Sequence, residues 1–458
     1  MPDKSGGRTL ETAVHPTERR ARIAGRETAL VLAVLAALLT ALLLLQPGAG
    51  EESNPPGSAL PAAPVPIAAG AEAISDDSLE APDSSSRMPA VWNQPRASAS
   101  GNAFWGPDVV GPFQQIWEIR TGYELFGAPV LIEETLYFGC NDSYFRAVSA
   151  ESGAAIWAFP VQCGISGEAA VDSSRVYFGG QDGYLYCLDR SSGSQQWKAG
   201  LGYHILSGVA IVADTLVVAG NSRGGVAAVS TRSGEVAWSD DLQGLVLGPA
   251  AADSLLVLTT ESGAVAAYSH DGARIWHRDL GRQCSAPSIS DGRVFVGLSS
   301  GILRCLSLTD GSDVWSADLQ AAGRRAVLCR PVVADELVIV GTSHSRLACV
   351  SASDGSISWT VEMENWVQVP PAVGDSTLYV SCDDKRLHVL SLPDGSPLDS
   401  LELGSYSGTA PTVADGVVYL GTAGGKMAAY RGTVPGTEAP QDATPAPGAD
   451  SDAGGALR

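Results

Sequence analysis

The sequence contains few charged and few aromatic residues. Only 17% of its 458 residues are charged and 7% are aromatic, whereas 52 are glycine. Such a composition suits many short strands joined by tight turns better than it suits a helical enzyme. We therefore expect a mostly β protein.

Positive charge is scarce as well. The chain holds 29 Lys and Arg against 50 Asp and Glu, a formal net charge of −21. Residues 1–27 carry a net +2, which leaves −23 on the rest. Such a field repels phosphate backbones, and no local basic patch offsets it. We exclude nucleic acid as a partner, and we read the acidity as a means of keeping an exported domain soluble.

Motifs of catalysis are absent. The chain has no Ser/His/Asp motif, no H-E-x-x-H and no phosphate-binding glycine loop. Single carboxylates stand in predicted turns, where Asp is also favoured for backbone reasons, and these are Asp142, Asp182, Glu261, Asp383 and Asp384. We expect no catalytic residue, no cofactor and no metal.

Histidine and cysteine follow no pattern of a metal or redox site. The six histidines, which share no common spacing, are His15, His204, His270, His277, His344 and His388. The eight cysteines, with no adjacent pair and no CxxC, are Cys140, Cys163, Cys187, Cys284, Cys305, Cys329, Cys349 and Cys382. Several recur at equivalent strand positions, which indicates small buried fillers. We expect between zero and two disulfides.

One long apolar run is present, at residues 28–45. It is uncharged over eighteen residues, just long enough to cross a bilayer, and Arg19, Arg20, Arg22 and Arg26 precede it. We predict a transmembrane signal anchor with residues 1–27 in the cytoplasm. Small residues at 48–50 leave open a cleaved signal peptide and secretion. Either reading places the remaining chain in the envelope, in the periplasm or outside.

Two segments have the composition of linkers. Residues 46–111 contain ten prolines and a net charge of −6, and residues 433–458 are similar in character. We predict a linker and a disordered tail. The aromatic residues Trp92 and Phe104–Trp105 either dock on the folded body or face solvent.

Between the linkers lies a repeat. Seven tryptophans are spaced 40, 40, 41, 38, 39 and 44 residues apart, the period of one four-stranded propeller blade: Trp117, Trp157, Trp197, Trp238, Trp276, Trp315 and Trp359. An eighth unit has lost its Trp near Leu398. Eight inner three-strand sets follow an unpaired outer strand at residues 115–119. We predict an eight-bladed β-propeller over residues 112–432, with the N-terminal strand closing the last blade.

The segment DGYLYCLDRSSGSQQW, at residues 182–197, resembles the repeat of the pyrroloquinoline-quinone (PQQ) type propeller family. The resemblance covers about residues 113–431 and implies that each Trp docks between adjacent blades. The family includes quinoprotein dehydrogenases, which use adjacent cysteines and long insertions, and a non-catalytic BamB-like branch. Neither adjacent cysteines nor long insertions occur here, so the resemblance favours the BamB-like branch.

The expected function is that of a non-catalytic, membrane-tethered, monomeric scaffold that binds an envelope protein, with outer-membrane protein assembly as one role. An atypical PQQ-dependent dehydrogenase and an extracytoplasmic peptide- or glycan-binding module remain alternatives. Loops after the outer strands share a face with the turns between second and third strands. Residues there that form a candidate interaction face, or else pack the central funnel, are Tyr123, Phe126, Tyr203, Arg324, Arg325, Trp366 and Tyr406.

Overall fold

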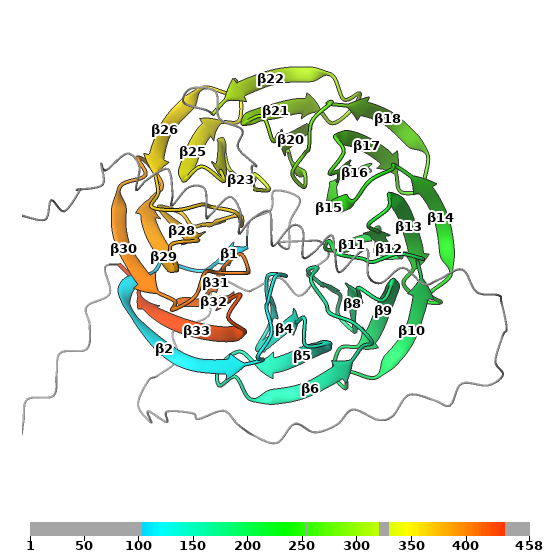
Figure 1. Cartoon of the computed structure of the whole chain (residues 1–458), viewed down its shortest axis with the longest axis horizontal. Coiled ribbons are helices and arrows are strands. Elements are labelled where there is room, and N and C mark those ends of the chain that lie inside the picture. Colours follow the sequence, from blue (N-terminus) through cyan, green and yellow to red (C-terminus); the bar gives the residue numbers. More distant parts are fainter. Residues whose placement is uncertain (1–102, 253–254, 320–328, 436–458) are drawn as a thin grey trace, which may run out of the picture. The chain divides into compact units, whose positions relative to one another are not determined.

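The computed structural model describes residues 103–252, 255–319 and 329–435. This part of the chain is all β, with 33 strands in eight sheets arranged as a ring of blades (Figure 1). Within it, no helix has the length and apolarity needed to cross a membrane. The predicted anchor at residues 28–45, most of the predicted linker, and Arg324 and Arg325 lie outside the described residues.

Seven blades each consist of four consecutive antiparallel strands. Blade one contains β3 (Val130–Ile132), β4 (Thr135–Gly139), β5 (Tyr144–Ser149) and β6 (Ala155–Pro160). Blade two contains β7 (Ala170–Val171), β8 (Arg175–Gly179), β9 (Tyr184–Asp189) and β10 (Gln195–Gly200). Blade three contains β11 (Ala210–Val212), β12 (Leu216–Gly220), β13 (Gly225–Ser230) and β14 (Val236–Asp241). Blade four contains β15 (Val246–Ala252), β16 (Leu255–Thr260), β17 (Ala264–Ser269) and β18 (Arg274–Asp279).

The next three blades repeat this order. Blade five contains β19 (Ser288–Ser290), β20 (Arg293–Gly297), β21 (Ile302–Ser307) and β22 (Asp313–Asp318). Blade six contains β23 (Val332–Ala334), β24 (Leu337–Gly341), β25 (Arg346–Ser351) and β26 (Ile357–Glu362). Blade seven contains β27 (Ala372–Val373), β28 (Thr377–Cys382), β29 (Arg386–Ser391) and β30 (Pro397–Glu402).

Blade eight joins the two ends of the propeller. It contains β31 (Thr412–Ala414), β32 (Val417–Gly421) and β33 (Lys426–Thr433), and its outer strand is β2 (Val110–Arg120). Strand β2 runs antiparallel to β33, with Trp117 opposite Ala429, and β1 (Phe104–Trp105) adds parallel to β31. The eight-bladed propeller and its closure by the N-terminal strand are therefore confirmed.

The propeller is slightly longer than predicted. The composition predicts a linker that extends to residue 111, but β1 and the start of β2 place residues 104–111 in blade eight, and β33 ends at Thr433. This segment resembles a linker in composition because Gly106 and Pro107 form the bend between the two strands, where such residues are favoured. Of the two readings of Phe104–Trp105, docking on the folded body is the one the backbone pairing supports.

The inner strands are covered on both faces. All but the first residue of β8 and β12 are buried, and β28 is buried throughout. Hydrophobic clusters run across the seams, such as that of blades two and three, which includes Tyr177, Cys187 and Val217. Near-continuous apolar runs bury well here because each sheet is packed between two others. The outer strands alternate instead, since their sheet edges lie at the rim.

Each tryptophan joins its own blade to the next. The Trp157 indole Nε1 donates to the carbonyl of Arg190 at 3.0 Å, and its ring lies against Gly193. A Cβ on Gly193, whose φ is +68°, would lie 2.6 Å from Trp157 Cδ2. The glycine four residues before a Trp thus supports the Trp of the preceding blade. All seven indoles donate at 2.8–3.0 Å, to the carbonyls of Ala150, Arg190, Thr231, His270, Leu308, Ala352 and Leu392.

The seam between blades seven and eight lacks a tryptophan. Asp399 stands there, because it pairs with Val389 in the register in which Trp359 pairs with Cys349. The segment of residues 103–113, the N-terminal strap, covers this seam instead. The Tyr379 hydroxyl donates to the carbonyl of Val109 at 3.0 Å and accepts from its amide at 2.6 Å. The Asp108 carboxylate accepts from the Ser376 amide at 2.8 Å.

The eight cysteines are all free thiols. Seven are buried, and Cys163 is half-buried. Cys187, Cys305 and Cys349 occupy equivalent sites on third strands, opposite a Trp of the outer strand. Their role as buried fillers therefore follows from their places in the strands.

Candidate binding face

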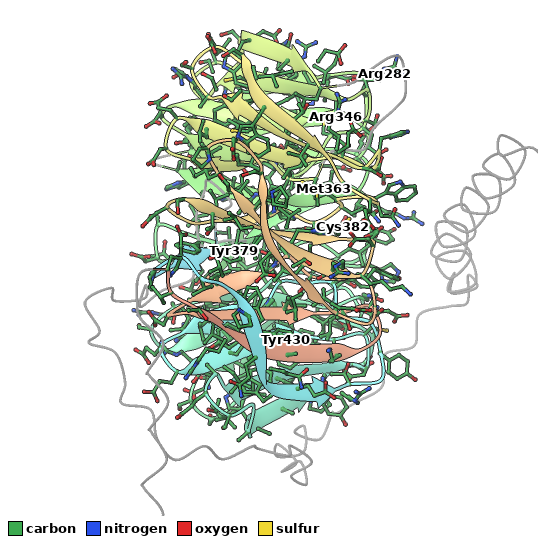
Figure 2. The ribbon with its side chains drawn as sticks, turned by 90° about the vertical axis from the view of Figure 1, so that its left-hand side faces the viewer. Arg282, Arg346, Met363, Tyr379, Cys382 and Tyr430 are labelled. Atoms are coloured by element: carbon green, nitrogen blue, oxygen red, sulfur yellow. The ribbon has the colours of Figure 1, made fainter. Side chains whose placement is uncertain are left out.

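Two sets of loops share one face of the propeller, here called the loop face. The chain leaving each outer strand bonds to the turn between the second and third strands of the same blade, as in Val161 N to Ser143 O at 2.9 Å. The same loop then reaches the next blade, as in Ser222 N to His204 O at 2.8 Å. The predicted sharing of this face is confirmed. In the edge-on view of Figure 2, Arg282 and Cys382 lie toward this face and Tyr379 toward the other.

Aromatic side chains stand out from the loop face. Tyr123, Phe126, Tyr203 and Tyr406 have exposed fractions of 59%, 42%, 46% and 45%, and they come from the loops after β2, β10 and β30. Trp366, in the loop after β26, is half-buried. The four exposed side chains do not pack as core of the central funnel. Their aromatic area is available to a partner.

Buried anchors explain why these aromatics point outward. Ile205 is fully buried and its amide donates to the carbonyl of Gly180 at 3.1 Å. Its side chain fills the space beside Gly179, where a Cβ would lie 2.1 Å from Ile205 Cγ2. Leu125 and Val367 are buried at corresponding positions. In each of these loops the aliphatic anchor residue is buried in the core, and the neighbouring aromatic residue remains at the surface.

An arginine that no sequence motif singles out completes one corner of this face. The guanidinium of Arg223 lies over the Tyr203 ring, 4.5 Å from its centroid, and Arg223 is exposed. Arg223 occupies the turn between β12 and β13, so it belongs to the second loop set that the repeat pattern placed here. The pairing joins blades two and three, and only the adjacency of blades brings it about. Cation–π pairs of this kind hold both side chains in one orientation.

The turn carboxylates do not converge on one ion. Asp142 accepts from the amide of Tyr144 and bonds Arg146, and Asp182 accepts from the hydroxyl of Tyr186 at 2.6 Å. Glu261 lies in blade four, away from Asp142 and Asp182, and it accepts from Gln283 Nε2 at 3.2 Å. Each of these carboxylates is bonded within its own blade or to a neighbouring loop, and the chain has no adjacent cysteines. These residues do not fit the calcium and quinone site that the dehydrogenase branch implies.

Two hollows of the described surface lie away from the axis. One, of about 470 Å³, lies between blades one and two and is lined in part by Tyr137, Ser174 and Arg190. The other, of about 370 Å³, lies between blades three and four and is lined in part by Gln243 and Arg274. Both sit at blade seams near the rim, where two sheets diverge.

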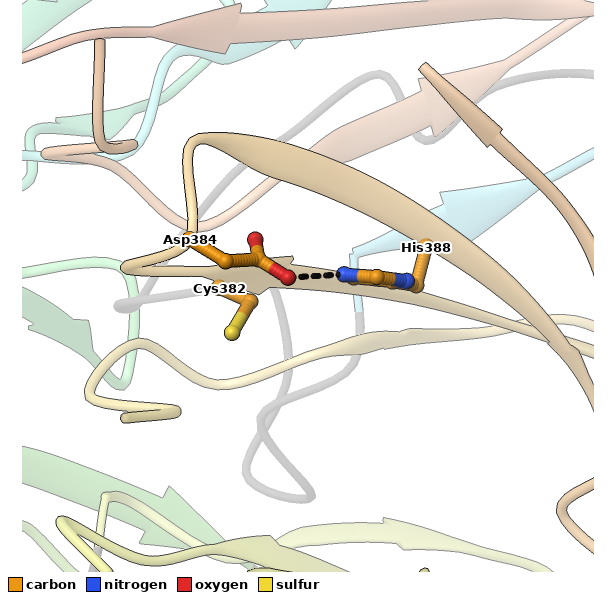
Figure 3. A group of neighbouring side chains, drawn as sticks. All are labelled: Cys382, Asp384 and His388. Atoms are coloured by element: carbon orange, nitrogen blue, oxygen red, sulfur yellow. Dashed lines mark hydrogen bonds and ion pairs between the residues drawn. The ribbon is translucent and has the colours of Figure 1, made fainter. Parts of the chain in front are cut away.

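One group of side chains with metal-ligating atoms comes together among the described residues. Cys382, Asp384 and His388 lie on the β28–β29 hairpin of blade seven (Figure 3). His388 Nε2 is 2.7 Å from Asp384 Oδ2, and Cys382 Sγ donates to the carbonyl of Asn365 at 3.3 Å. Burial raises the pKa of the Cys382 thiol to about 12. Sequence spacing alone does not bring these three residues together.

Known proteins resemble this chain in sequence and in fold. The sequence model of the family described as outer membrane protein assembly factor BamB matches residues 114–201, 141–239, 181–359 and 299–436. A curated relative, outer membrane protein assembly factor BamB of Shewanella oneidensis, is 28% identical over 122 residues. That match spans 25% of this chain and 31% of the relative's length.

Solved structures share the propeller. BamB from Moraxella catarrhalis superposes with a TM-score of 0.60 at 17% identity, covering 70% of this chain and 99% of that one. A quinohemoprotein alcohol dehydrogenase from Pseudomonas putida has a TM-score of 0.65 at 13% identity, covering 78% and 82%. At these identities both show the fold alone. Because the family match extends over most of the propeller, this chain belongs to the family described as outer membrane protein assembly factor BamB.

Proposed function

We propose that this chain is a non-catalytic scaffold, tethered to the membrane through residues 28–45, that binds an envelope protein with its loop face. The observation that carries the proposal is the gathering of exposed Tyr123, Phe126, Tyr203 and Tyr406 on one face. Aromatic and Arg side chains dominate the binding free energy of protein interfaces. The exposed Tyr203–Arg223 pair offers both types together.

We propose further that this chain and the envelope protein it binds take part in outer-membrane protein assembly. The support for this role is the family match and the description of the Shewanella oneidensis relative. Arg324 and Arg325, which the sequence predicts for the same face, lie outside the described residues and remain part of the proposal. A single propeller can supply this surface, because its ring of eight blades closes within one chain.

The test is photo-crosslinking in intact membranes. A photoreactive residue is placed at Tyr203 or Tyr406 on the loop face, at Ile275 on the rim, or at Ser192 on the opposite face. Ile275 is 48% exposed, so it controls for apolar exposure alone. The proposal expects one adduct of the same mass from Tyr203 and Tyr406, and little from the two control positions.

A double variant tests the energetics. Tyr203→Ala with Arg223→Ala should lower the adduct yield at position 406 about tenfold, because a hot-spot pair contributes roughly 1–2 kcal/mol or more. Ile156→Ala, on the rim, should leave it unchanged. Adducts arising equally from Ile275 or Ser192 would contradict binding through the loop face. Dye-linked alcohol oxidation after addition of PQQ and calcium would contradict the non-catalytic assignment.

A further inference from the structure

Three equivalent positions recur on the hairpin between the second and third strands. In blade one they hold Cys140, Asp142 and Arg146, and the guanidinium of Arg146 bonds the Asp142 carboxylate. In blade two, Asp182 accepts from Tyr186 four residues later. The carboxylate-to-side-chain bond thus recurs in blades one and two, where it stabilises the turn.

In blade seven the same positions hold Cys382, Asp384 and His388, and all three residue types can ligate a metal. Their ligand atoms lie within 4.8 Å of one another. Asp384 Oδ1 accepts from the Arg386 amide at 3.0 Å, which fixes the carboxylate and leaves Oδ2 toward His388. Figure 3 shows this hairpin with the three side chains.

The hairpin is held firmly. Cys382 pairs with Arg386, and Val380 with His388, in the β28–β29 ladder. The turn is covered by the loop after β26, because the Asp383 amide donates to the Trp366 carbonyl at 2.9 Å and Gln368 Nε2 bonds the Asp383 carboxylate. The side chains of Asp384 and His388 are 7% and 16% exposed. The three groups are therefore preorganised, with Cys382 buried and His388 the most exposed of the three.

We propose that Cys382 Sγ, Asp384 Oδ2 and His388 Nε2 bind Zn²⁺, with a water in the fourth position. A sulfur, nitrogen and oxygen donor set is typical of zinc, whose ligand bonds of about 2.0–2.3 Å draw the donor atoms to within about 3–4 Å of each other. That requires side-chain movements of about 1 Å from the present separations. Three protein ligands leave one coordination position open, as in sites that accept an incoming group.

The protons balance simply. Zn²⁺ displaces the thiol proton of Cys382 to solvent and takes the place of the hydrogen bond between His388 and Asp384. The Nε2 proton that made this hydrogen bond leaves to solvent while Nδ1 takes one up, so neutral His388 keeps a single ring proton, on Nδ1. The dication meets one thiolate and one carboxylate, so the buried charge is compensated, which an unmetallated thiolate at this site would not be.

The chain itself offers the control variant. His388→Arg reproduces the blade-one arrangement of Asp142 with Arg146, so it should keep the turn bond and lose the metal. Full-length protein, stripped with a chelator, is titrated with Zn²⁺ and separately with Co²⁺, whose thiolate coordination produces a near-ultraviolet charge-transfer band. We expect one equivalent bound and a Co²⁺ band in the wild type, and neither in His388→Arg or Cys382→Ser.

Melting temperatures in chelator report whether each variant is folded. If His388→Arg fails to fold, Cys382→Ser and Asp384→Asn carry the test. The proposal would be overturned if the wild-type protein showed no Co²⁺–thiolate band. It would also be overturned if these variants left the band and the stoichiometry unchanged. Binding of zinc without a Co²⁺–thiolate band would mean that other residues, such as the remaining histidines, hold the metal, and this too would contradict the proposal.

Discussion

Trp276 illustrates at the residue scale how the blades adhere. Its side chain is 8% exposed, it packs in the cluster of blades four and five, and its Nε1 donates to the carbonyl of Leu308 at 2.8 Å. A large ring buries a wide apolar area while the indole N–H is satisfied by backbone. Ile275 beside it is 48% exposed because adjacent strand residues face opposite sides. Burial, more than residue type, decides which of the two matters for stability.

Trp276→Ala should therefore lower the free energy of unfolding by about 3–5 kcal/mol, the range for removing a buried aromatic ring. Ile275→Ala should change it by less than about 0.5 kcal/mol. Urea unfolding followed by circular dichroism measures both. Equal losses in the two variants would mean that the seam does not depend on the docked indole.

Single residues also determine how the stability of the fold depends on acid pH. Burial opposes ionisation of Asp240, but hydrogen bonds from Arg274, the Asp241 amide and Tyr268 outweigh it, so the pKa of Asp240 is lowered. A carboxyl with a depressed folded-state pKa adds stability above its unfolded pKa of about 4, and this is lost as pH falls through the folded value.

Asp240→Asn should thus melt below the wild type near pH 6, and the two melting temperatures should converge as the pH falls below about 4. Arg274→Ala should show the same convergence, since it removes the other half of the interaction. Melting curves from pH 6 to pH 3 provide the measurement. A difference that stays constant over this range would exclude the ion pair as its source.

At the scale of elements, the N-terminal strap replaces a missing tryptophan. Asp399 cannot fill the seam between blades seven and eight as an indole does, and residues 103–113 supply the contacts instead. Phe104 stacks on Tyr379 with ring centroids 5.9 Å apart, and Asp108 accepts from the Thr377 hydroxyl at 2.7 Å. The chain leading from the linker is thereby bonded to blade seven before it forms the outer strand of blade eight.

Tyr379→Phe should loosen this element selectively. It removes the hydroxyl that bonds both polar backbone groups of Val109, at a cost of about 1–3 kcal/mol for buried groups left unpaired. Hydrogen exchange should accelerate in residues 103–118 while blades three and four keep their protection. Tyr177→Phe is the matched control, because Tyr177 holds the equivalent strand position but bonds Asp172 of its own blade. Faster exchange of the strap in both variants would contradict the assignment.

The whole molecule combines a closed ring with one differentiated face. The ring follows from the repeat, because each blade can bury its inner strands only against neighbours, and the eighth sheet must use the first long strand. The loop face differs from blade to blade, since its residues are free of the packing that keeps the blades alike. Both the proposed binding face and the proposed zinc site use positions at which the repeat varies.

Much of the fold could be predicted because the periodic signal is strong. Seven tryptophans and their glycines set the blade count and the order of strands, and the unpaired strand around Trp117 predicted the closure. The strap is not predicted as part of a blade because it follows a Pro/Ala/Ser-rich segment and contains two glycines and two prolines, although Asp108 and Val109 bond to residues about 270 positions away. Composition reports local preference and carries no information about such distant partners.

The repeat, the eight blades and the buried apolar strands can all be predicted from the amino-acid sequence, since they depend on patterns repeated every 40 residues or so. The folded chain alone shows which residues meet across seams and hairpins: Arg223 over Tyr203, the strap against Tyr379, and Cys382 beside Asp384 and His388. Such contacts depend on side-chain direction and on the adjacency of blades. Each involves a few atoms and leaves no period in the sequence.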